Sequence, residues 1–346
     1  MRSFSGFCVT FAGTALVLMG FGAPAAQAQS PVVVNCTFEL EWCEAMRVKF
    51  EQSTGQKALI SRKTDGEILA QIKAEAGNPR FDVWHSAGPD VTAIAAREGL
   101  LETYQSPKLP ELYDWAQKAA AASQYTLTPI YTGVIGFGYN KDLLAKKGMP
   151  EPKCWADLTN PAYRNEIQMA DPSTSGTAYT MVATVLQIMG EDKGFEYLKA
   201  LHKNINQYTR SGTAGIRSAA RGETTIAVAF LHDAVAQSVD GFPIVSVAPC
   251  EGTGFEMPGV AIVKDARNLA GAKKWVDFVL SPEGQNVQLE MKKYQLQSNK
   301  DAKIHPLAPR ADQVKLINYD ILKYSASDAH DRILDRFEKD VKSAPK

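Results

Sequence analysis

Three short apolar runs decide the fold class of this chain: Val32-Val33-Val34, Leu59-Ile60 and Phe81-Asp82-Val83-Trp84. A helical apolar pattern fills residues 39–53 between the first two runs, and a second helical pattern continues to residue 76 before the third. The order strand, helix, strand, helix, strand is typical of an α/β fold with a mostly parallel sheet. In such sheets ligands bind beyond the carboxyl ends of the strands, so we expect the binding residues there.

The first 28 residues predict a cleavable secretory signal. Arg2 precedes an apolar run that extends through Phe21, and Ala26-Gln27-Ala28 has the small residues of a cleavage site. Cys8 precedes most of the apolar run, which argues against a lipid anchor at the cleavage point. No later apolar run approaches the roughly 18 residues of a membrane helix. We therefore expect a soluble exported protein.

About 318 residues follow the signal, which is more than one compact domain usually holds, so we expect two lobes. The extended stretch of residues 125–139 is suited to leave one lobe and enter the other, and the chain returns near Cys250-Glu251-Gly252-Thr253-Gly254. This division places residues 29–130 and 255–346 in lobe 1 and residues 131–254 in lobe 2.

The net charge of the chain gives no reason to expect a nucleic-acid partner. The chain has 38 basic and 38 acidic residues, and loss of Arg2 with the signal leaves 37 against 38, a net charge of about −1. This balance lacks the basic excess that binds nucleic acid, so we expect no nucleic-acid partner. A preference for anions must then come from a local site.

Four cysteines remain after the signal, and an even number in an exported chain favours disulfides. Cys36 lies at the end of the first strand and Cys43 in the first turns of the next helix, so the natural pairs are Cys36–Cys43 and Cys154–Cys250. Free thiols are the alternative. Neither Cys-x-x-Cys nor metal-ligand spacing occurs, so we expect no metal site and no cofactor.

A hydroxyl-rich stretch, Asp171-Pro172-Ser173-Thr174-Ser175-Gly176-Thr177-Ala178, ends where a helical apolar pattern begins, and Gly190 ends that pattern. The first amides of a helix lack internal partners and carry the positive end of the helix dipole. Because glycine also admits a ligand close to the backbone, the stretch predicts an anion-binding cradle. An ordinary capped helix is the alternative, since serine and threonine are common N-caps.

A second stretch, Arg210-Ser211-Gly212-Thr213-Ala214-Gly215, repeats the Ser-Gly-Thr-Ala core and opens another helical pattern, which Gly222 ends. Two helix starts built alike favour one anion held between them.

His232-Asp233 follows directly on an apolar strand pattern, which puts both side chains where open α/β sheets hold ligands. His232 is either a ligand contact or a buried histidine, and Glu256 is either a ligand contact or a solvated turn residue. Paired acids Asp233 and Glu256 would suit glycoside hydrolysis. However, the chain has no nucleophile elbow, zinc-hydrolase motif or phosphate loop, so we expect a binding protein and not an enzyme.

Several motifs together resemble the periplasmic solute-binding proteins of ABC importers. The resemblance is to the group labelled ferric-iron-binding, which also includes binders of hexose phosphates and 2-aminoethylphosphonate, and it covers roughly residues 33–299. The motifs are Glu41-Trp42-Cys43-Glu44-Ala45-Met46, Leu69-Ala70-Gln71-Ile72-Lys73-Ala74-Glu75, Ser175-Gly176-Thr177-Ala178-Tyr179, His202-Lys203-Asn204-Ile205-Asn206-Gln207-Tyr208-Thr209, Phe230-Leu231-His232-Asp233 and Pro249-Cys250-Glu251-Gly252-Thr253-Gly254.

The resemblance implies a two-lobed flytrap fold, similar to type II binding proteins, with two crossover strands. It implies a periplasmic protein that closes on a small anionic solute and delivers it to an inner-membrane ABC permease, and we expect a monomer. In the hexose-phosphate relatives hydroxyl-rich cradles hold the phosphate, which implies phosphate contacts here from Ser173, Thr174, Ser175, Gly176, Thr177, Ser211, Gly212 and Thr213. The same relatives imply that His232, Asp233 and Glu256 hold sugar hydroxyls.

Lobe 1 departs from the hexose-phosphate relatives at two places. Thr64-Asp65-Gly66 and His85-Ser86-Ala87-Gly88 stand where those relatives carry, respectively, small hydroxyls with glycine and tryptophan with glycines. We expect Thr64, Asp65, His85 and Ser86 to face the non-phosphate half of the ligand. Asp65 points away, binds a sugar hydroxyl or pairs with an ammonium group, so a zwitterion such as 2-aminoethylphosphonate is the nearest alternative ligand.

Ferric iron is a further alternative. Ferric sites in this superfamily use neighbouring tyrosines, whereas this chain has no Tyr-Tyr pair. Ferric ion favours phenolate or carboxylate oxygen, while amide and hydroxyl groups suit a bound anion. The sequence therefore favours a sugar phosphate.

Overall fold

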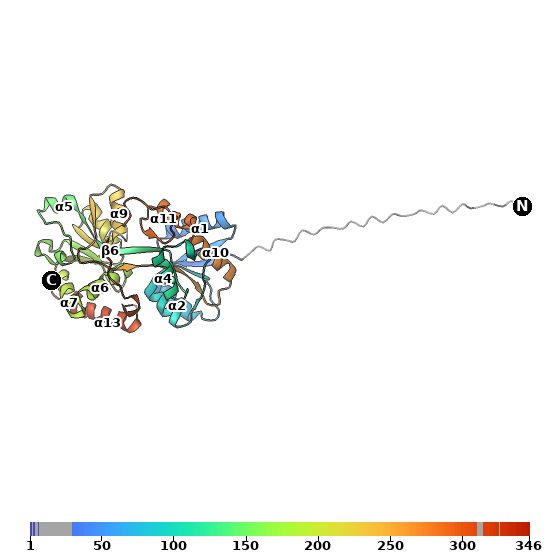
Figure 1. Ribbon diagram of the computed structural model, residues 1–346, viewed down its shortest axis with the longest axis horizontal. Coiled ribbons are helices and arrows are strands. Elements are labelled where there is room, and N and C mark those ends of the chain that lie inside the picture. Colours follow the sequence, from blue (N-terminus) through green and yellow to red (C-terminus); the bar gives the residue numbers. More distant parts are fainter. Residues whose placement is uncertain (2, 4–5, 7–29, 310–313, 325) are drawn as a thin grey trace.

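The computed structural model describes residues 30–309, 314–324 and 326–346, together with residues 1, 3 and 6. The predicted signal, residues 1–28, lies almost wholly outside the described residues. The described chain forms two α/β bodies side by side along the long axis, and strand β6 (Tyr131–Asn140) lies between them (Figure 1). The α/β class and the two-lobed fold are confirmed.

One sheet, sheet 1, has the strand order β2-β1-β3-β12-β4, and β5 also pairs with β12. Its strands are β1 (Val32–Cys36), β2 (Ala58–Arg62), β3 (Val83–Ala87), β4 (Leu101–Glu102), β5 (Thr128–Pro129) and β12 (Gly259–Val263). The first three strands are parallel, so their carboxyl ends meet at one edge.

The other sheet, sheet 2, has the order β10-β6-β9-β7-β8, and β11 and β13 also pair with β6. Its further strands are β7 (Ile167–Ala170), β8 (Ile205–Thr209), β9 (Ile226–Phe230), β10 (Ile244–Val247), β11 (Phe255–Glu256) and β13 (Leu296–Gln297). Strands β7, β8 and β9 are parallel, so their carboxyl ends also share an edge.

Most strands of each sheet run in one direction, as predicted, but both sheets are mixed because one strand in each runs the opposite way. Strand β12 reaches sheet 1 from the other body and pairs antiparallel with β3, β4 and β5. Strand β6 likewise enters sheet 2 antiparallel to β9 and β10. The strand–helix alternation fixes the direction of successive strands only, and these two strands enter through crossovers.

Helices follow the parallel strands and begin at the shared edges. Those near sheet 1 in the chain are α1 (Leu40–Thr54), α2 (Asp65–Ala74), α3 (Pro89–Arg97), α4 (Asp114–Ala122), α10 (Leu269–Val279) and α11 (Pro282–Glu290). Those associated with sheet 2 are α5 (Lys141–Lys146), α6 (Gly176–Met189), α7 (Glu191–His202), α8 (Ala214–Arg221), α9 (Leu231–Val239), α12 (Ile321–Tyr324) and α13 (Ser327–Phe337). Among the described residues no helix is long and apolar enough to cross a membrane.

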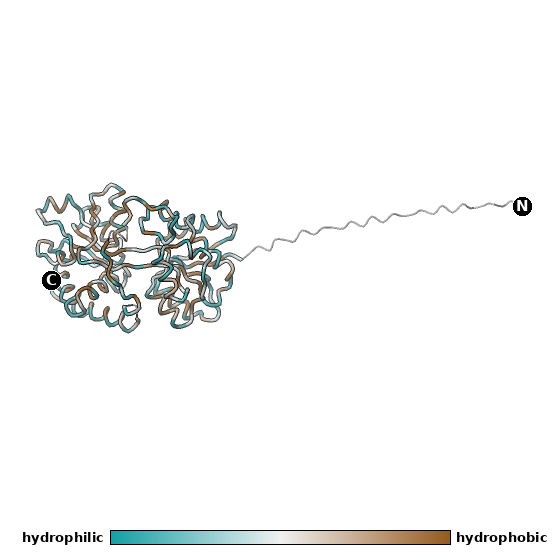
Figure 2. The backbone as a smooth tube through the Cα atoms, in the orientation of Figure 1, coloured by the Kyte–Doolittle hydropathy of each residue, from teal (hydrophilic) through white to brown (hydrophobic). Residues whose placement is uncertain are grey.

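Each body has its own apolar core, visible as brown segments inside both bodies (Figure 2). Trp42, Phe50 and Trp275 pack together beside sheet 1. The core of sheet 2 includes Phe137 and Trp155, whose rings lie 5.8 Å apart.

The C-terminal segment packs on the second body. Phe337 and Val341 lie in the core of sheet 2, and Arg332 and Arg336 form ion pairs with Glu191 of α7. Figure 1 shows α13 next to α6 and α7. The sequence prediction counts residues 255–346 with lobe 1. In the structure α13 packs on the second body, whereas α12 contacts α3 of the first, and the division into lobes stays a prediction.

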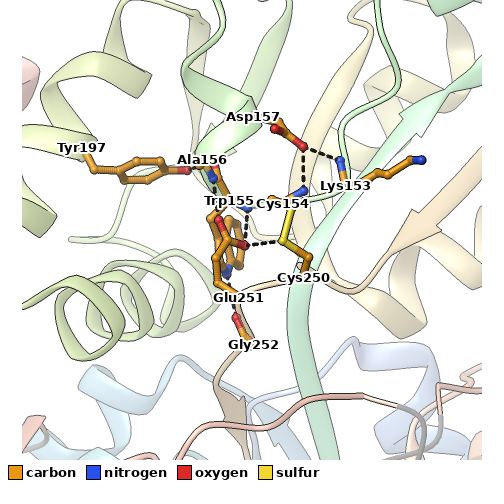
Figure 3. The surroundings of a disulfide bond; sticks show 9 residues. All are labelled: Lys153, Cys154, Trp155, Ala156, Asp157, Tyr197, Cys250, Glu251 and Gly252. Atoms are coloured by element: carbon orange, nitrogen blue, oxygen red, sulfur yellow. Dashed lines mark hydrogen bonds between the residues drawn. A yellow bond between two sulfur atoms is a disulfide. The ribbon is translucent and has the colours of Figure 1, made fainter.

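Both predicted disulfides are confirmed. Cys36 is bonded to Cys43, and Cys154 is bonded to Cys250 across 96 residues. Beside the second bond, Glu251 accepts hydrogen bonds from the amides of Trp155 and Ala156 at 2.8 Å each (Figure 3). The loop at residue 154 is thereby tied to the chain that returns to the first body.

Candidate functional site

Two of the predicted helix starts lie in contact at the edge of sheet 2. Ser175 is the N-cap of α6 and its hydroxyl accepts a hydrogen bond from the Ala178 amide. A Cβ atom built on Gly212 would lie only 2.2 Å from Thr177 Oγ1, so the start of α6 rests directly on the loop before α8. The second stretch can approach the first this closely because it has glycine there. The sequence repeat therefore corresponds to one joint surface.

Some hydroxyls of the first stretch are already engaged. Ser173 Oγ donates to Asp171 Oδ1 at 2.6 Å, and Asp171 forms an ion pair with Lys342 at 2.7 Å. Thr174 Oγ1 lies 3.3 Å from the Arg210 carbonyl, which links the two stretches. The hydroxyl groups of Ser173 and Thr174 therefore stabilise this joint surface. Gly176 and Thr177 lie at the start of helix α6.

The second stretch borders a hollow of about 240 Å³. Ser211 and Thr213 share a hydrogen bond at 3.1 Å, and Thr213 lines the hollow. Its further lining includes Arg217, His232, Asp233 and Lys293. The structure thus brings the second helix start together with the predicted His-Asp pair.

His232 and Asp233 lie in the first turn of α9, directly after β9. The buried His232 ring stacks on Phe230 with centroids 5.2 Å apart, and its Nε2 lies 3.7 Å from Asp233 Oδ1. Burial and, to a smaller extent, the Lys293 ammonium lower the pKa of His232 to about 3. Burial raises the pKa of Asp233 to about 7, with repulsion from Glu39 adding to the shift. A neutral imidazole and a partly protonated carboxyl group can both donate and accept hydrogen bonds.

Two charged residues that line the hollow, Arg217 and Lys293, and their partner Glu39 were not predicted. Lys293 Nζ lies 3.0 Å from Glu39 Oε1, and Arg217 Nη2 lies 3.8 Å from the same oxygen. Arg217 had a sequence signal, because it follows Thr213 by four residues and so lies on the same face of the helix. Glu39 also had one, since it is the N-cap residue of α1 after strand β1. Lys293 follows the end of α11, where no pattern marks it.

Three acidic residues, Glu256, Asp65 and Asp90, form the other part of the site. Glu256 Oε1 lies 3.6 Å from the position of a Cβ built on Gly176, and Asp65 and Asp90 both lie against Gly88. Burial and, to a smaller extent, repulsion from Asp90 and Asp65 raise the pKa of Glu256 to about 8. Asp90 was not predicted, although it lies in the first turn of α3 after a parallel strand.

Asp65 is turned toward the end of β3. Its Oδ1 accepts hydrogen bonds from Trp84 Nε1 at 3.0 Å and from the Gly88 amide at 3.4 Å. Burial raises its pKa to about 7, and Asp90 adds repulsion. The expected turn at residues 62–66 is shorter than predicted, because helix α2 already begins at Asp65.

The remaining predicted residues of lobe 1 are less well placed. Thr64 is the exposed N-cap of α2, and its hydroxyl is engaged with Glu67 in a capping box. His85 and Ser86 belong to strand β3 and not to a loop beyond it. The His85 ring is fully buried between Trp42 and Trp275, and neither ring nitrogen has a hydrogen-bond partner in the described chain, so its ligand contact stays a prediction. Ser86 is also buried and has a left-handed φ of 59°.

One group of described side chains has the spacing of metal ligands, namely Cys154, Cys250 and Glu251. Both sulfurs are joined in the disulfide of Figure 3, so they are unavailable as thiolate ligands.

Comparisons with known proteins show the family of this chain. The family model of the bacterial extracellular solute-binding proteins matches residues 79–324. An uncharacterized Haemophilus influenzae protein is 40% identical over 334 residues, which is 96% of each chain.

Two solved structures share the fold. The periplasmic binding protein AfuA from Actinobacillus pleuropneumoniae, with exogenous fructose-6-phosphate bound, is 43% identical and has a TM-score of 0.85, covering 91% of this chain and 99% of that one. Iron-bound HitA from Pseudomonas aeruginosa is 19% identical with a TM-score of 0.76, covering 88% of this chain and 98% of that one. The second likeness concerns the fold alone. On the family match and the 40% identity, this chain belongs to the bacterial extracellular solute-binding proteins.

Proposed function

We propose that this protein is the periplasmic substrate-binding component of an ABC importer and that it captures a small phosphorylated solute, a sugar phosphate such as a hexose phosphate. The observation that carries the proposal is the contact between the two hydroxyl-rich helix starts at Thr177 and Gly212. Amides at two helix starts favour an anion, and His232 and Asp233 border the same hollow as Thr213. The similarity to AfuA with bound fructose-6-phosphate supports the choice of ligand.

The acidic part of the site is compatible with a phosphate group. A carboxyl group whose pKa lies near 8 is mostly protonated at pH 7, so Glu256 beside Gly176 does not carry a full negative charge. In the protonated form it donates a hydrogen bond to a ligand oxygen. Glu256, Asp65 and Asp233 are therefore suited to the hydroxyl groups of a sugar.

Binding and transport are coupled through closure. A ligand that contacts both bodies binds the closed state more tightly and shifts the population toward it. Each charge-assisted hydrogen bond contributes roughly 1.5 to 3 kcal/mol, so three or four of them allow micromolar affinity after the costs of ordering. The permease then distinguishes the loaded protein from the empty one.

The test is loss of phosphate affinity in the double variant Thr177→Val and Thr213→Val. We expect its dissociation constant for glucose 6-phosphate to rise at least tenfold in calorimetry, because two hydroxyl donors are lost. Thr159→Val is a matched control, since that hydroxyl bonds only within its own turn to Ala156. An affinity within about twofold of the wild type in the double variant would contradict the proposal.

A zwitterion such as 2-aminoethylphosphonate is the second candidate ligand. The grouping of Asp65, Asp90 and Glu256 favours it, because an ammonium group would offset their mutual repulsion. In that case Asp65→Asn abolishes binding of 2-aminoethylphosphonate and leaves glucose 6-phosphate binding unchanged. Thermal-shift measurements with both ligands distinguish the two candidates, since bound ligand raises the unfolding midpoint.

A further inference from the structure

Two cations of the hollow share one carboxylate oxygen. Arg217 lies on α8, one turn after Thr213, and Lys293 lies on the segment between α11 and β13. Both approach Glu39 Oε1, at 3.8 and 3.0 Å. Glu39 is the N-cap residue of α1 in the other body, and its second oxygen, Oε2, is buried with no hydrogen-bond partner in the described chain.

The charges around these cations do not balance. Lys292, also at the hollow, is paired with Asp240 at 2.7 Å, so these two cancel. His232 is neutral at pH 7, and Asp233 is partly protonated because burial raises its pKa to about 7. Glu39 and the partial negative charge of Asp233 then oppose two cations, which leaves a small excess of positive charge beside the start of α8.

We infer that Arg217 and Lys293 make the site selective for ligands that carry a doubly charged phosphate group. This phosphate group binds at the Thr213 side of the hollow. This inference rests on the proposed function and adds the ligand's orientation. The hydroxyl half would then extend toward Glu256 and Asp65, whose raised pKa values suit neutral hydrogen-bond partners. Arginine contributes a planar donor fork and lysine a point charge, and both are common in phosphate recognition.

The experiment compares two ligands that differ mainly in charge, glucose 6-phosphate and glucose 6-sulfate, at pH 7.5. The phosphate ester is mostly a dianion at this pH, while the sulfate ester carries one charge. We expect the wild type to bind the phosphate at least tenfold more tightly than the sulfate. In Arg217→Gln and in Lys293→Gln the phosphate affinity falls at least tenfold and the sulfate affinity falls less, so the ratio between them approaches one.

Arg221→Gln is the matched control, because Arg221 lies on the same helix but is paired with Glu223 on the exposed surface. It should leave both affinities within twofold. Arg217→Lys and Lys293→Arg keep the charge, so they should keep most of the ratio between phosphate and sulfate affinity. A variant that lost affinity through misfolding would not keep this ratio. Thermal unfolding midpoints of all variants are measured alongside.

Three outcomes are decisive. A wild-type ratio that persists in both glutamine variants overturns the inference and leaves the proposed function intact. A ratio near one in the wild type, with sugar phosphate still bound, overturns the inference as well. Absence of glucose 6-phosphate binding by the wild type overturns the proposed function, and the inference with it.

Discussion

At the scale of single residues, the site contains three carboxyl groups whose pKa values are raised. Asp65, Asp233 and Glu256 all have pKa values raised chiefly by burial, to about 7, 7 and 8. Like charges reinforce the shift, since Asp90 acts on both Asp65 and Glu256. Such groups offer a donor and an acceptor at once, which matches the hydroxyl groups of a sugar.

Glu256→Gln should change how stability depends on pH. An acid with a higher pKa in the folded than in the unfolded protein binds more protons when folded, so it makes the free energy of unfolding fall as pH rises from about 4.5 to about 8. Glutamine removes this contribution. We expect the variant to gain about 1 to 2 kcal/mol over the wild type between pH 5 and pH 8, measured by urea unfolding at both pH values.

Glu191→Gln is the control for that experiment. Hydrogen bonds from Arg332 are the largest cause that lowers the pKa of Glu191. Its contribution is therefore fully present at both pH 5 and pH 8, and the variant should lose similar stability at each. A Glu256→Gln curve parallel to that of the wild type would show that Glu256 is ionised throughout this range.

The residues of the site were partly predictable from the sequence. His232 and Asp233 were proposed because polar residues directly after an apolar strand lie at the sheet edge, and Thr213 because its Ser-Gly-Thr-Ala run repeats the first helix start. The position of His85 within a strand was not predicted. The apolar run ends at Trp84, but β3 continues through Ala87 and turns the His85 ring into the core. Lys293 could not be predicted, because only the fold brings its segment to α8.

At the scale of elements, glycines determine where two helices end and how closely the starts of α6 and α8 approach each other. Gly55 and Gly222 end α1 and α8 in the left-handed conformation, which is why those boundaries could be predicted closely. Gly212 has a different role, since its missing side chain allows Thr177 to approach. The mixed sheets could not be predicted, because pairing with β6 and β12 depends on crossovers between the bodies.

Gly212→Ala should separate the two helix starts. The added Cβ atom would lie 2.2 Å from Thr177 Oγ1 and 2.6 Å from its Cβ, so the loop or the helix must move. We expect a loss of about 1 to 3 kcal/mol in the free energy of unfolding and weaker binding of glucose 6-phosphate.

Gly66→Ala provides the comparison, because Gly66 lies in α2 with nothing within 4 Å of the new atom. It should be neutral or stabilising by up to about 1 kcal/mol. Adding Thr177→Gly to the Gly212→Ala variant should restore its stability, because the clash is removed. It should not restore the affinity for glucose 6-phosphate. Equal stability of the two alanine variants would argue against close contact of the helix starts.

At the scale of the whole molecule, the C-terminal segment forms a link between the bodies besides the crossover strands. Residue 253 pairs with Leu316, and the amide of Ile317 donates to the Thr253 carbonyl at 2.9 Å, so the segment runs along the returning crossover. Beyond it, α12 packs against α3 of the first body, while α13 is anchored on the second. Ile321 lies next to Glu256 in a small cavity that also includes Asp90 and Gly176. Separation of the bodies must therefore disturb the α12–α3 contact.

Ile321→Ala should weaken closure more than folding. Loss of part of a half-buried isoleucine costs about 1 kcal/mol, and if α12 meets α3 only in the closed state, affinity for the solute falls about fivefold. Leu334→Ala on α13 is the matched control, because Leu334 packs on the core of sheet 2. It should lower the unfolding midpoint and leave affinity nearly unchanged. Calorimetry, thermal unfolding and the radius of gyration with and without glucose 6-phosphate measure both effects, and affinity loss only in Leu334→Ala would assign closure to α13 instead.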